Sequence, residues 1–185
     1  MSETPTINAH LEIATLAGGC FWCIESAFSQ LKGITSATSG YMGGSTIKPT
    51  YEEVCSGETG HAEVVQLAFE RTMISYQEIL EIFFTLHDPT QLNRQGNDVG
   101  TQYRSAIFYH NELQYAIAKK TLKTMRDEQV FKQEIVTHIG PVDVFYAGED
   151  YHQNYFNTNP ENQYCQAVVS PKLTKFRQTF INKLK

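Results

Sequence analysis

The stretch 20–23, Cys-Phe-Trp-Cys, has the residue types and spacing for thiol chemistry. An apolar segment at 11–17 predicts a buried strand, and a glycine pair separates it from helical apolar spacing over 20–31. Cys20 therefore falls in the first turn of the predicted helix, where unpaired backbone N–H groups and the helix dipole favour an anion. We expect Cys20 to be biased toward thiolate, the nucleophilic form. The neighbouring aromatic pair suits a reaction on a small, partly apolar group.

Three further cysteines bear on this chemistry. Cys23 is three residues after Cys20, so both sulfurs lie on one helix face within reach of a disulfide. Cys165 lies in a predicted loop, from which a thiol can swing toward an oxidised partner. Either thiol could resolve a sulfenic acid formed on Cys20. We interpret Cys55 as a buried, inert thiol.

Carboxyl, phenol and imidazole groups gather in three polar segments next to predicted strands. Glu63 begins a strand whose other face is apolar, and burial would raise its pKa so that it acts as a general acid. A surface glutamate is the alternative. Tyr51 and Tyr103 could donate hydrogen bonds to a developing oxyanion, or simply pack half-buried. His61 and His152 raise the alternative of a Cys–His pair, as in thiol proteases.

The elements that must position these residues run strand–helix–strand twice, followed by a helix and more strands. We predict strands at 11–17, 33–41, 62–70, 105–109, 135–139 and 142–146. We predict helices at 20–31, 75–86, 111–129 and 170–184, the second opening on a capping box and the last on Ser170 as N-cap. Long polar loops are expected at 87–104 and 148–164. This order predicts an α+β fold with a split-βαβ sheet.

Composition narrows the function classes. The chain has 185 residues and a net charge of −5, which predicts one domain over 1–185 with a flexible arm at 1–10. The sequence has no run of basic residues that could bind along a phosphate backbone. Nucleic acid and anionic membrane are therefore excluded as primary partners. Neither a secretory signal nor an apolar run of about 18 residues is visible, so we expect the cytoplasm. One close cysteine pair does not match a four-ligand zinc site.

Five segments together resemble the A-type peptide methionine sulfoxide reductases: GGCFWCIE (18–25), YEEVCSG (51–57), GHAEVV (60–65), GTQYRS (100–105) and EDYHQNY (149–155). The resemblance implies a two-layer α/β sandwich with a ferredoxin-like core and helices packed on a mixed sheet. It also implies reduction of methionine-S-sulfoxide, free or in proteins, as a repair of oxidative damage. No cofactor is expected beyond an external thiol reductant, thioredoxin, and we expect a monomer.

The resemblance assigns roles by matching position. These are Cys20 as nucleophile, Glu63 as acid, Tyr51 and Tyr103 as donors to the sulfoxide oxygen, Phe21 and Trp22 as the methyl pocket, and Asp98 and His152 as further pocket residues. Many family members carry glycine where this chain has Cys23, and many end in a glycine-rich tail with recycling cysteines that this chain lacks. Cys165 is the favoured resolving thiol and Cys23 its rival.

Two other functions stay open from the residues alone. A general thiol–disulfide oxidoreductase would use residues 20–23 as a CxxC motif, although nothing here resembles the thioredoxin arrangement. A non-enzymatic module would use the four thiols to bind zinc or a partner. Activity toward protein disulfides would favour the oxidoreductase. Stoichiometric zinc would favour the non-enzymatic module.

Overall fold

Strands and helices alternate along most of the chain in the computed structural model, which describes residues 10–185. The strands are β1 (Leu11–Gly18), β2 (Ile34–Met42), β3 (Ala62–Glu70), β4 (Arg94–Gln95), β5 (Asp98–Val99), β6 (Ser105–Tyr109), β7 (His138–Pro141) and β8 (Tyr146–Ala147). The helices are α1 (Phe21–Phe28), α2 (Tyr51–Cys55), α3 (Tyr76–Leu86), α4 (Glu112–Asp127), α5 (Tyr155–Thr158) and α6 (Ser170–Thr179). Apart from His10, the predicted arm at 1–10 lies outside the described residues.

A six-stranded sheet in the order β7-β6-β1-β3-β2-β8 forms the centre of the fold. Strand β3 runs antiparallel to both β1 and β2, and β6 runs antiparallel to β1 on the other side. Only β7 joins in parallel, next to β6, so the sheet is mixed. The units β1–α1–β2 and β3–α3–β6 are therefore interleaved as in a ferredoxin-like fold. This confirms the predicted α+β class and its split-βαβ core.

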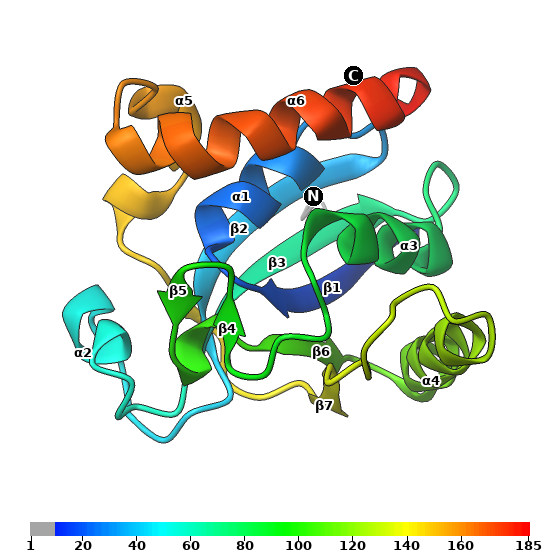
Figure 1. Cartoon of the computed structure of the whole chain (residues 1–185), viewed down its shortest axis with the longest axis horizontal. Coiled ribbons are helices and arrows are strands. Elements are labelled where there is room, and N and C mark those ends of the chain that lie inside the picture. Colours follow the sequence, from blue (N-terminus) through cyan, green and yellow to red (C-terminus); the bar gives the residue numbers. More distant parts are fainter. Residues whose placement is uncertain (1–9) are drawn as a thin grey trace, which may run out of the picture.

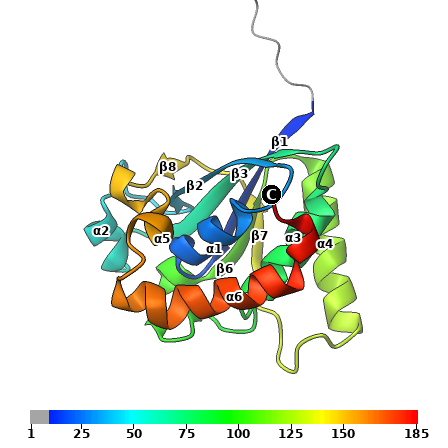
Figure 2. The same ribbon diagram turned by 90° about the horizontal axis from the view of Figure 1, so that it is seen from above.

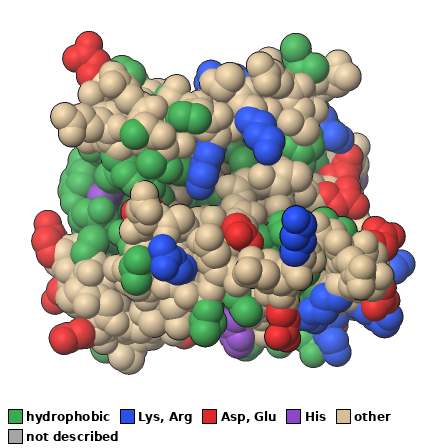
Figure 3. Space-filling model, in the orientation of Figure 1, with side chains coloured by type: hydrophobic (Ala, Val, Ile, Leu, Met, Phe, Trp, Pro, Cys, Tyr) green, Lys and Arg blue, Asp and Glu red, His purple; other side chains and the backbone are tan. Residues whose placement is uncertain are grey.

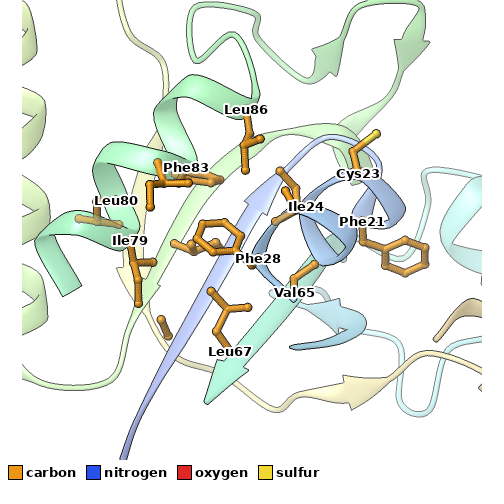
Figure 4. Close-up of a cluster of buried hydrophobic side chains, with 14 of the residues drawn as sticks. Phe21, Cys23, Ile24, Phe28, Val65, Leu67, Ile79, Leu80, Phe83 and Leu86 are labelled. Carbon is orange, nitrogen blue, oxygen red and sulfur yellow. The ribbon is translucent and has the colours of Figure 1, made fainter. Parts of the chain in front are cut away.

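Helices α1, α3 and α4 pack against the sheet, and α6 lies across the outside of α1 (Figures 1 and 2). Figure 4 shows Ile24 and Phe28 of α1 pointing toward Ile79 and Phe83 of α3, above Leu67 of β3. Because α1 has the sheet beneath it and α6 above it, nearly every one of its side chains is buried. In residues 10–185 we find no helix with the length and apolar character needed to cross a membrane.

Two glycines between β1 and α1 allow the chain to turn sharply into the helix. A Cβ atom on Gly18 would lie 2.8 Å from the ring of Phe83, so this strand end packs directly against α3. Gly19 has a φ of 88°, a conformation that side chains other than glycine rarely adopt. The turn makes Cys20 the N-cap residue of α1.

Most predicted elements are confirmed to within two residues. Helix α1 ends at Phe28 and not at 31, α6 ends at Thr179 and not at 184, and the C-terminal third differs most. Gly140 and Pro141 lie inside β7 and do not separate two strands, and the second strand is only the short β8. Ser170 is not an N-cap, because a π-helical turn at Cys165–Val169 already leads into α6. The predicted loop at 148–164 contains α5, and the loop at 87–104 contains the β4–β5 hairpin.

The predicted capping box of α3 is present and should contribute measurably to stability. The Ser75 hydroxyl accepts a hydrogen bond from the backbone N–H of Glu78 at 3.1 Å, and the Glu78 carboxylate accepts one from Ser75 N–H at 2.8 Å. We predict that Ser75→Ala lowers the free energy of unfolding by about 1 kcal/mol, measured by urea denaturation. Ser36→Ala, at an exposed serine of β2, is the control; equal stability of the two variants would contradict the prediction.

Candidate active site

Cys20 lies at the start of α1 with only 9% of its surface exposed. Burial raises the pKa of its thiol well above the ordinary value, and neighbouring Cys23 and Glu63 act in the same direction. The backbone N–H of Trp22 favours the thiolate but is outweighed. Burial therefore opposes the resting thiolate that the sequence predicts. A helix N-terminus stabilises an anion only where burial and nearby negative charge do not oppose it.

Glu63 is 2% exposed and extends from β3 to the start of α1. Its Oε1 accepts a hydrogen bond from the backbone N–H of Phe21 at 3.1 Å. Burial raises the pKa of this carboxyl to about 8, although the hydrogen bond from Phe21 opposes the shift. The alternative of a surface glutamate is excluded. At neutral pH the carboxyl is mostly protonated and has a proton to give.

A cavity of about 220 Å³ opens beside these two groups. Its walls come from α1, α2, β3, β5, the turn at Thr101–Tyr103 and the segment before α6. The lining residues are Cys20, Trp22, Tyr51, Glu63, Asp98, Tyr103, Asn162 and Tyr164. The structure thus brings together residues from five separate parts of the sequence. On the left of the face drawn in Figure 3, apolar side chains gather between α5 and α2.

The two predicted tyrosines are half-buried and neutral. Tyr51 is the first residue of α2, and Tyr103 ends the short turn before β6. Burial raises the pKa of both phenols, and the negative charge of Glu63 raises it further. Both are consequently hydrogen-bond donors across the physiological pH range. Cys55, four residues after Tyr51, is exposed and not buried as predicted.

Trp22 forms the aromatic wall of the cavity and is held from behind. Its ring stacks on Tyr155, with centroids 3.8 Å apart and planes 7° from parallel. Its indole N–H donates to Nδ1 of His152 at 3.1 Å. Phe21 and His152 do not line the cavity, and their rings contact each other with centroids 5.1 Å apart. These two predicted pocket residues support the wall without forming its surface.

Asp98 does line the cavity, and its side chain contacts a part of the cavity wall that the sequence did not predict. Its carboxylate accepts a hydrogen bond from the hydroxyl of Tyr164 at 2.5 Å, so the β4–β5 hairpin is tied to the segment before α6. The ring of Tyr164 meets Trp22 edge-on. Tyr164 and Asn162 were missed because only tertiary packing brings them here. The sole local signal was that Tyr164 directly precedes Cys165.

Comparison with known proteins decides the family. The model of a family described as peptide methionine sulfoxide reductase matches residues 12–184. The chain belongs to this family. The peptide methionine sulfoxide reductase MsrA of Saccharolobus solfataricus is 53% identical over 175 residues, covering 95% of this chain and 98% of that protein.

Solved structures agree with this assignment. Reduced Mxr1 from Saccharomyces cerevisiae matches with a TM-score of 0.76 and 34% identity over 89% of this chain and 92% of that one. Mxr1 in complex with Trx2 shares the fold at a TM-score of 0.53 and 24% identity, over 84% and 89% of the two chains. This protein is thus an oxidoreductase that acts on methionine sulfoxide.

The four cysteines of this reductase are free thiols. The side chains of Cys20 and Cys23 interact, and this interaction raises the pKa of the former and lowers that of the latter. Cys165 is fully buried, in a helical turn, where the negative charge of Cys23 contributes to a raised pKa. The prediction that Cys165 lies on a flexible loop is therefore wrong. The sequence Asn-Gln-Tyr before it suggested a loop, but packing against α1 and α6 organises the segment.

His61 is excluded as the base of a Cys–His pair. Its Nδ1 accepts the backbone N–H of Gly44 at 2.9 Å, and its Nε2 lies 2.7 Å from the carbonyl oxygen of Thr46. Both ring nitrogens are thus occupied in holding the loop after β2. Within residues 10–185 no cluster of three or more His, Cys, Asp or Glu side chains could hold a metal ion, so the zinc alternative gains no support.

Glu149, which the sequence did not single out, organises the side of the site near α2. Its carboxylate accepts hydrogen bonds from the Tyr41 hydroxyl at 3.1 Å and from the backbone N–H of Tyr51 at 3.3 Å. The second contact fixes the start of α2 and with it the Tyr51 side chain. Glu149 thereby positions Tyr51 in the wall of the cavity.

The buried carboxyl of Glu63 should make stability depend on pH. Its folded-state pKa of about 8 lies above the ordinary value of 4.5, so the folded state binds more protons between these limits. The contribution of Glu63 to the free energy of unfolding is therefore full below about pH 4.5. It falls as pH rises to about 8, by at most about 1.4 kcal/mol per pH unit. We predict that Glu63→Gln flattens this decline in urea unfolding free energies. Glu58→Gln, at an exposed position, should leave the slope unchanged; a wild-type slope in Glu63→Gln would refute the assignment.

Proposed function

We propose that the cavity reduces methionine-S-sulfoxide, free or within proteins, with Cys20 as the attacking thiol and Glu63 as the proton donor. The observation that carries this proposal is the convergence of a thiol and a protonated carboxyl on one small, aromatic-walled cavity. A sulfoxide sulfur becomes electrophilic only when its oxygen is protonated or strongly hydrogen-bonded. Tyr51 and Tyr103, both neutral donors on the cavity wall, would hold that oxygen.

The first step needs no external electron donor, because Cys20 supplies both electrons. The sulfur of Cys20 attacks the sulfoxide sulfur as Glu63 protonates the oxygen. The attack forms a sulfur–sulfur bond between Cys20 and the substrate, and the sulfur–oxygen bond breaks as the oxygen leaves as water, which carries one proton from Glu63 and one from the Cys20 thiol. This water then attacks the sulfur of Cys20, the sulfur–sulfur bond breaks, methionine leaves with the electron pair, and Cys20 is left as a sulfenic acid. The proton that the water releases returns to Glu63. The substrate is reduced by two electrons and Cys20 is oxidised by two.

The cavity offers a different surface to each substituent of the sulfoxide sulfur. Oxygen would meet Glu63 and the tyrosines, and the methyl group would meet Trp22, whose ring Tyr155 supports from behind. Cys20 attacks from the third side, which leaves the rest of the methionine facing the opening. Because the sulfur is a chiral centre, such an arrangement accepts one epimer. The resemblance to A-type reductases makes it the S epimer.

For the second step we propose Cys23 as the thiol that resolves the sulfenic acid, in place of the sequence-based preference for Cys165. Cys23 lies three residues after Cys20 at the start of α1, and its interaction with the Cys20 thiol lowers its pKa and favours its reactive thiolate. Cys165 is buried in a helical turn beside Cys23. Condensation of the Cys20 sulfenic acid with Cys23 releases water and forms a disulfide. Cys165 could take over the bond only by later exchange.

The disulfide must then be reduced by an external dithiol, for which we propose a thioredoxin. The solved complex of Mxr1 with Trx2 supports this class of partner. Every group in the sequence of steps is a protein side chain, so the proposal requires no prosthetic group. We further propose that the enzyme acts as a monomer in the cytoplasm, where reductants keep thiols free between turnovers.

A general thiol–disulfide oxidoreductase fits the site less well. Cys20 is almost buried and faces a cavity of about 220 Å³ whose walls are aromatic on one side. A protein disulfide with its flanking backbone needs an open surface around the attacking sulfur. The side chain of methionine sulfoxide, which ends in a sulfoxide and a methyl group, fits the available space.

Removing the proton donor should slow the first step specifically. We predict that Glu63→Gln lowers the single-turnover rate of methionine-S-sulfoxide reduction by 10² to 10⁴-fold, the usual range for loss of general acid catalysis. The wild-type rate should fall as pH rises through about 8, where Glu63 loses its proton, and the variant should lack this limb. Cys20→Ser should abolish turnover and sets the background. A variant rate within a few-fold of wild type would refute the role of Glu63.

The resolving thiol can be identified from the first disulfide formed. We predict that mass spectrometry after one turnover without reductant finds a link between Cys20 and Cys23, and that Cys165→Ser still forms it at the wild-type rate. Cys23→Ser should instead accumulate the sulfenic acid, trapped by a dimedone-type reagent. A link between Cys20 and Cys165 in the wild-type enzyme would restore the sequence-based preference.

A further inference from the structure

Glu25 is a buried acid on α1 that the proposed chemistry does not use. Only 5% of the residue is exposed, within a helix enclosed by the sheet and by α6. Burial raises the pKa of its carboxyl to about 7. A buried carboxyl is unfavourable unless its hydrogen bonds compensate for the water it has lost. The position therefore calls for an explanation beyond packing.

The carboxyl has one strong partner, far away in the sequence. The backbone N–H of Asn154 donates to Glu25 Oε1 at 2.7 Å. Asn154 has a φ of 56°, a left-handed conformation that residues other than glycine adopt at a cost of order 1 kcal/mol. The hydroxyl of Ser39 in β2 faces the same carboxyl without completing a hydrogen bond of normal geometry. Glu25 thus holds this left-handed turn from another element of the fold.

The residues on either side of Asn154 build the support for the aromatic wall. His152 accepts the indole N–H of Trp22, and Tyr155 stacks on its ring. Trp22 and Glu25 are three residues apart on α1, so they share one face of the helix. The segment 152–155 is therefore attached to this face at three points, of which the Glu25 contact is the central one. Gln153 holds the same segment to the backbone of Ser39 in β2, and the Glu25 contact ties the turn itself to α1.

We propose that Glu25 is a positioning residue: its hydrogen bond to Asn154 holds His152 and Tyr155 against Trp22 and so fixes the apolar wall of the pocket. The functional part rests on the proposed function, because it takes that wall to be the seat of the substrate methyl group. The structural part stands without it. Glu25 touches neither the cavity nor Cys20, so it acts only through the wall.

Two substitutions separate hydrogen bonding from shape. Glu25→Met keeps the length of the side chain but has no acceptor for Asn154 N–H. Glu25→Gln keeps a carbonyl oxygen that accepts it. Trp22 is the only tryptophan of the chain, so its fluorescence reports on the wall directly.

We expect Glu25→Met to shift the Trp22 emission and to raise KM for methionine-S-sulfoxide about tenfold with kcat changed less than about threefold, the pattern of lost substrate binding. Glu25→Gln should restore both. The matched control is Gln114→Met, which removes another buried side chain that bonds backbone, here the N–H of His110 and the carbonyl of Ile13. It should lower stability and leave emission and KM unchanged. Wild-type emission and KM in Glu25→Met, or equal damage in Glu25→Gln, would overturn the proposal.

Hydrogen exchange on the wild-type protein tests the contact even where a variant fails to fold. The amide of Asn154 should exchange far more slowly than an exposed amide, and exchange at the exposed rate would overturn the proposal. Emission and exchange do not depend on turnover. If both behave as expected while the protein reduces no sulfoxide, the proposed function fails and the positioning role of Glu25 in the fold stands.

Discussion

The hydrogen bond from the backbone N–H of Phe21 to Glu63 Oε1, 3.1 Å long, joins the first turn of α1 to β3 inside the protein. The rest of the site is arranged around it. It holds a carboxyl next to Cys20, and it occupies one of the N–H groups that would otherwise favour a thiolate there. Burial keeps the carboxyl protonated despite this bond. The same contact therefore holds Glu63 in place and removes one N–H group that would stabilise the thiolate form of Cys20.

The side of the cavity opposite Glu63 depends on a segment that has little regular structure of its own. Residues 149–155 are held by hydrogen bonds to α1, β2 and α2: Glu149 accepts from the Tyr41 hydroxyl and the Tyr51 backbone, Gln153 bonds the backbone of Ser39, and the backbone of Asn154 donates to Glu25. Each contact is polar and directional, unlike the apolar packing between α1 and α3. The core thus places the thiol and the acid, and a polar network places the aromatic wall.

The residues that the sequence located correctly are those whose placement follows from local pattern. The glycine pair before Cys20 and the alternation over 62–70 put the thiol at a helix start and Glu63 on a buried strand. Ionisation could not be predicted, because the pKa of Cys20 depends on burial and on a carboxyl from another strand. The same limit explains Cys165 and Tyr164. Their polar neighbours are typical of a loop, and only packing against α1 and Asp98 gives the segment its place.

A cavity lined by neutral groups suits a neutral substrate. With the Cys20 thiol, the Glu63 carboxyl and both phenols protonated, the cavity carries little charge beyond that of Asp98, which Tyr164 already satisfies. A sulfoxide can then enter without displacing a bound ion, and its polar oxygen finds donors in place of water. In the proposed reaction, charge develops only as Cys20 gives up its proton and Glu63 delivers one. Donors that the fold holds in place beforehand stabilise that charge without having to reorient as solvent would. The raised pKa of Cys20 is for this reason compatible with its proposed role as nucleophile.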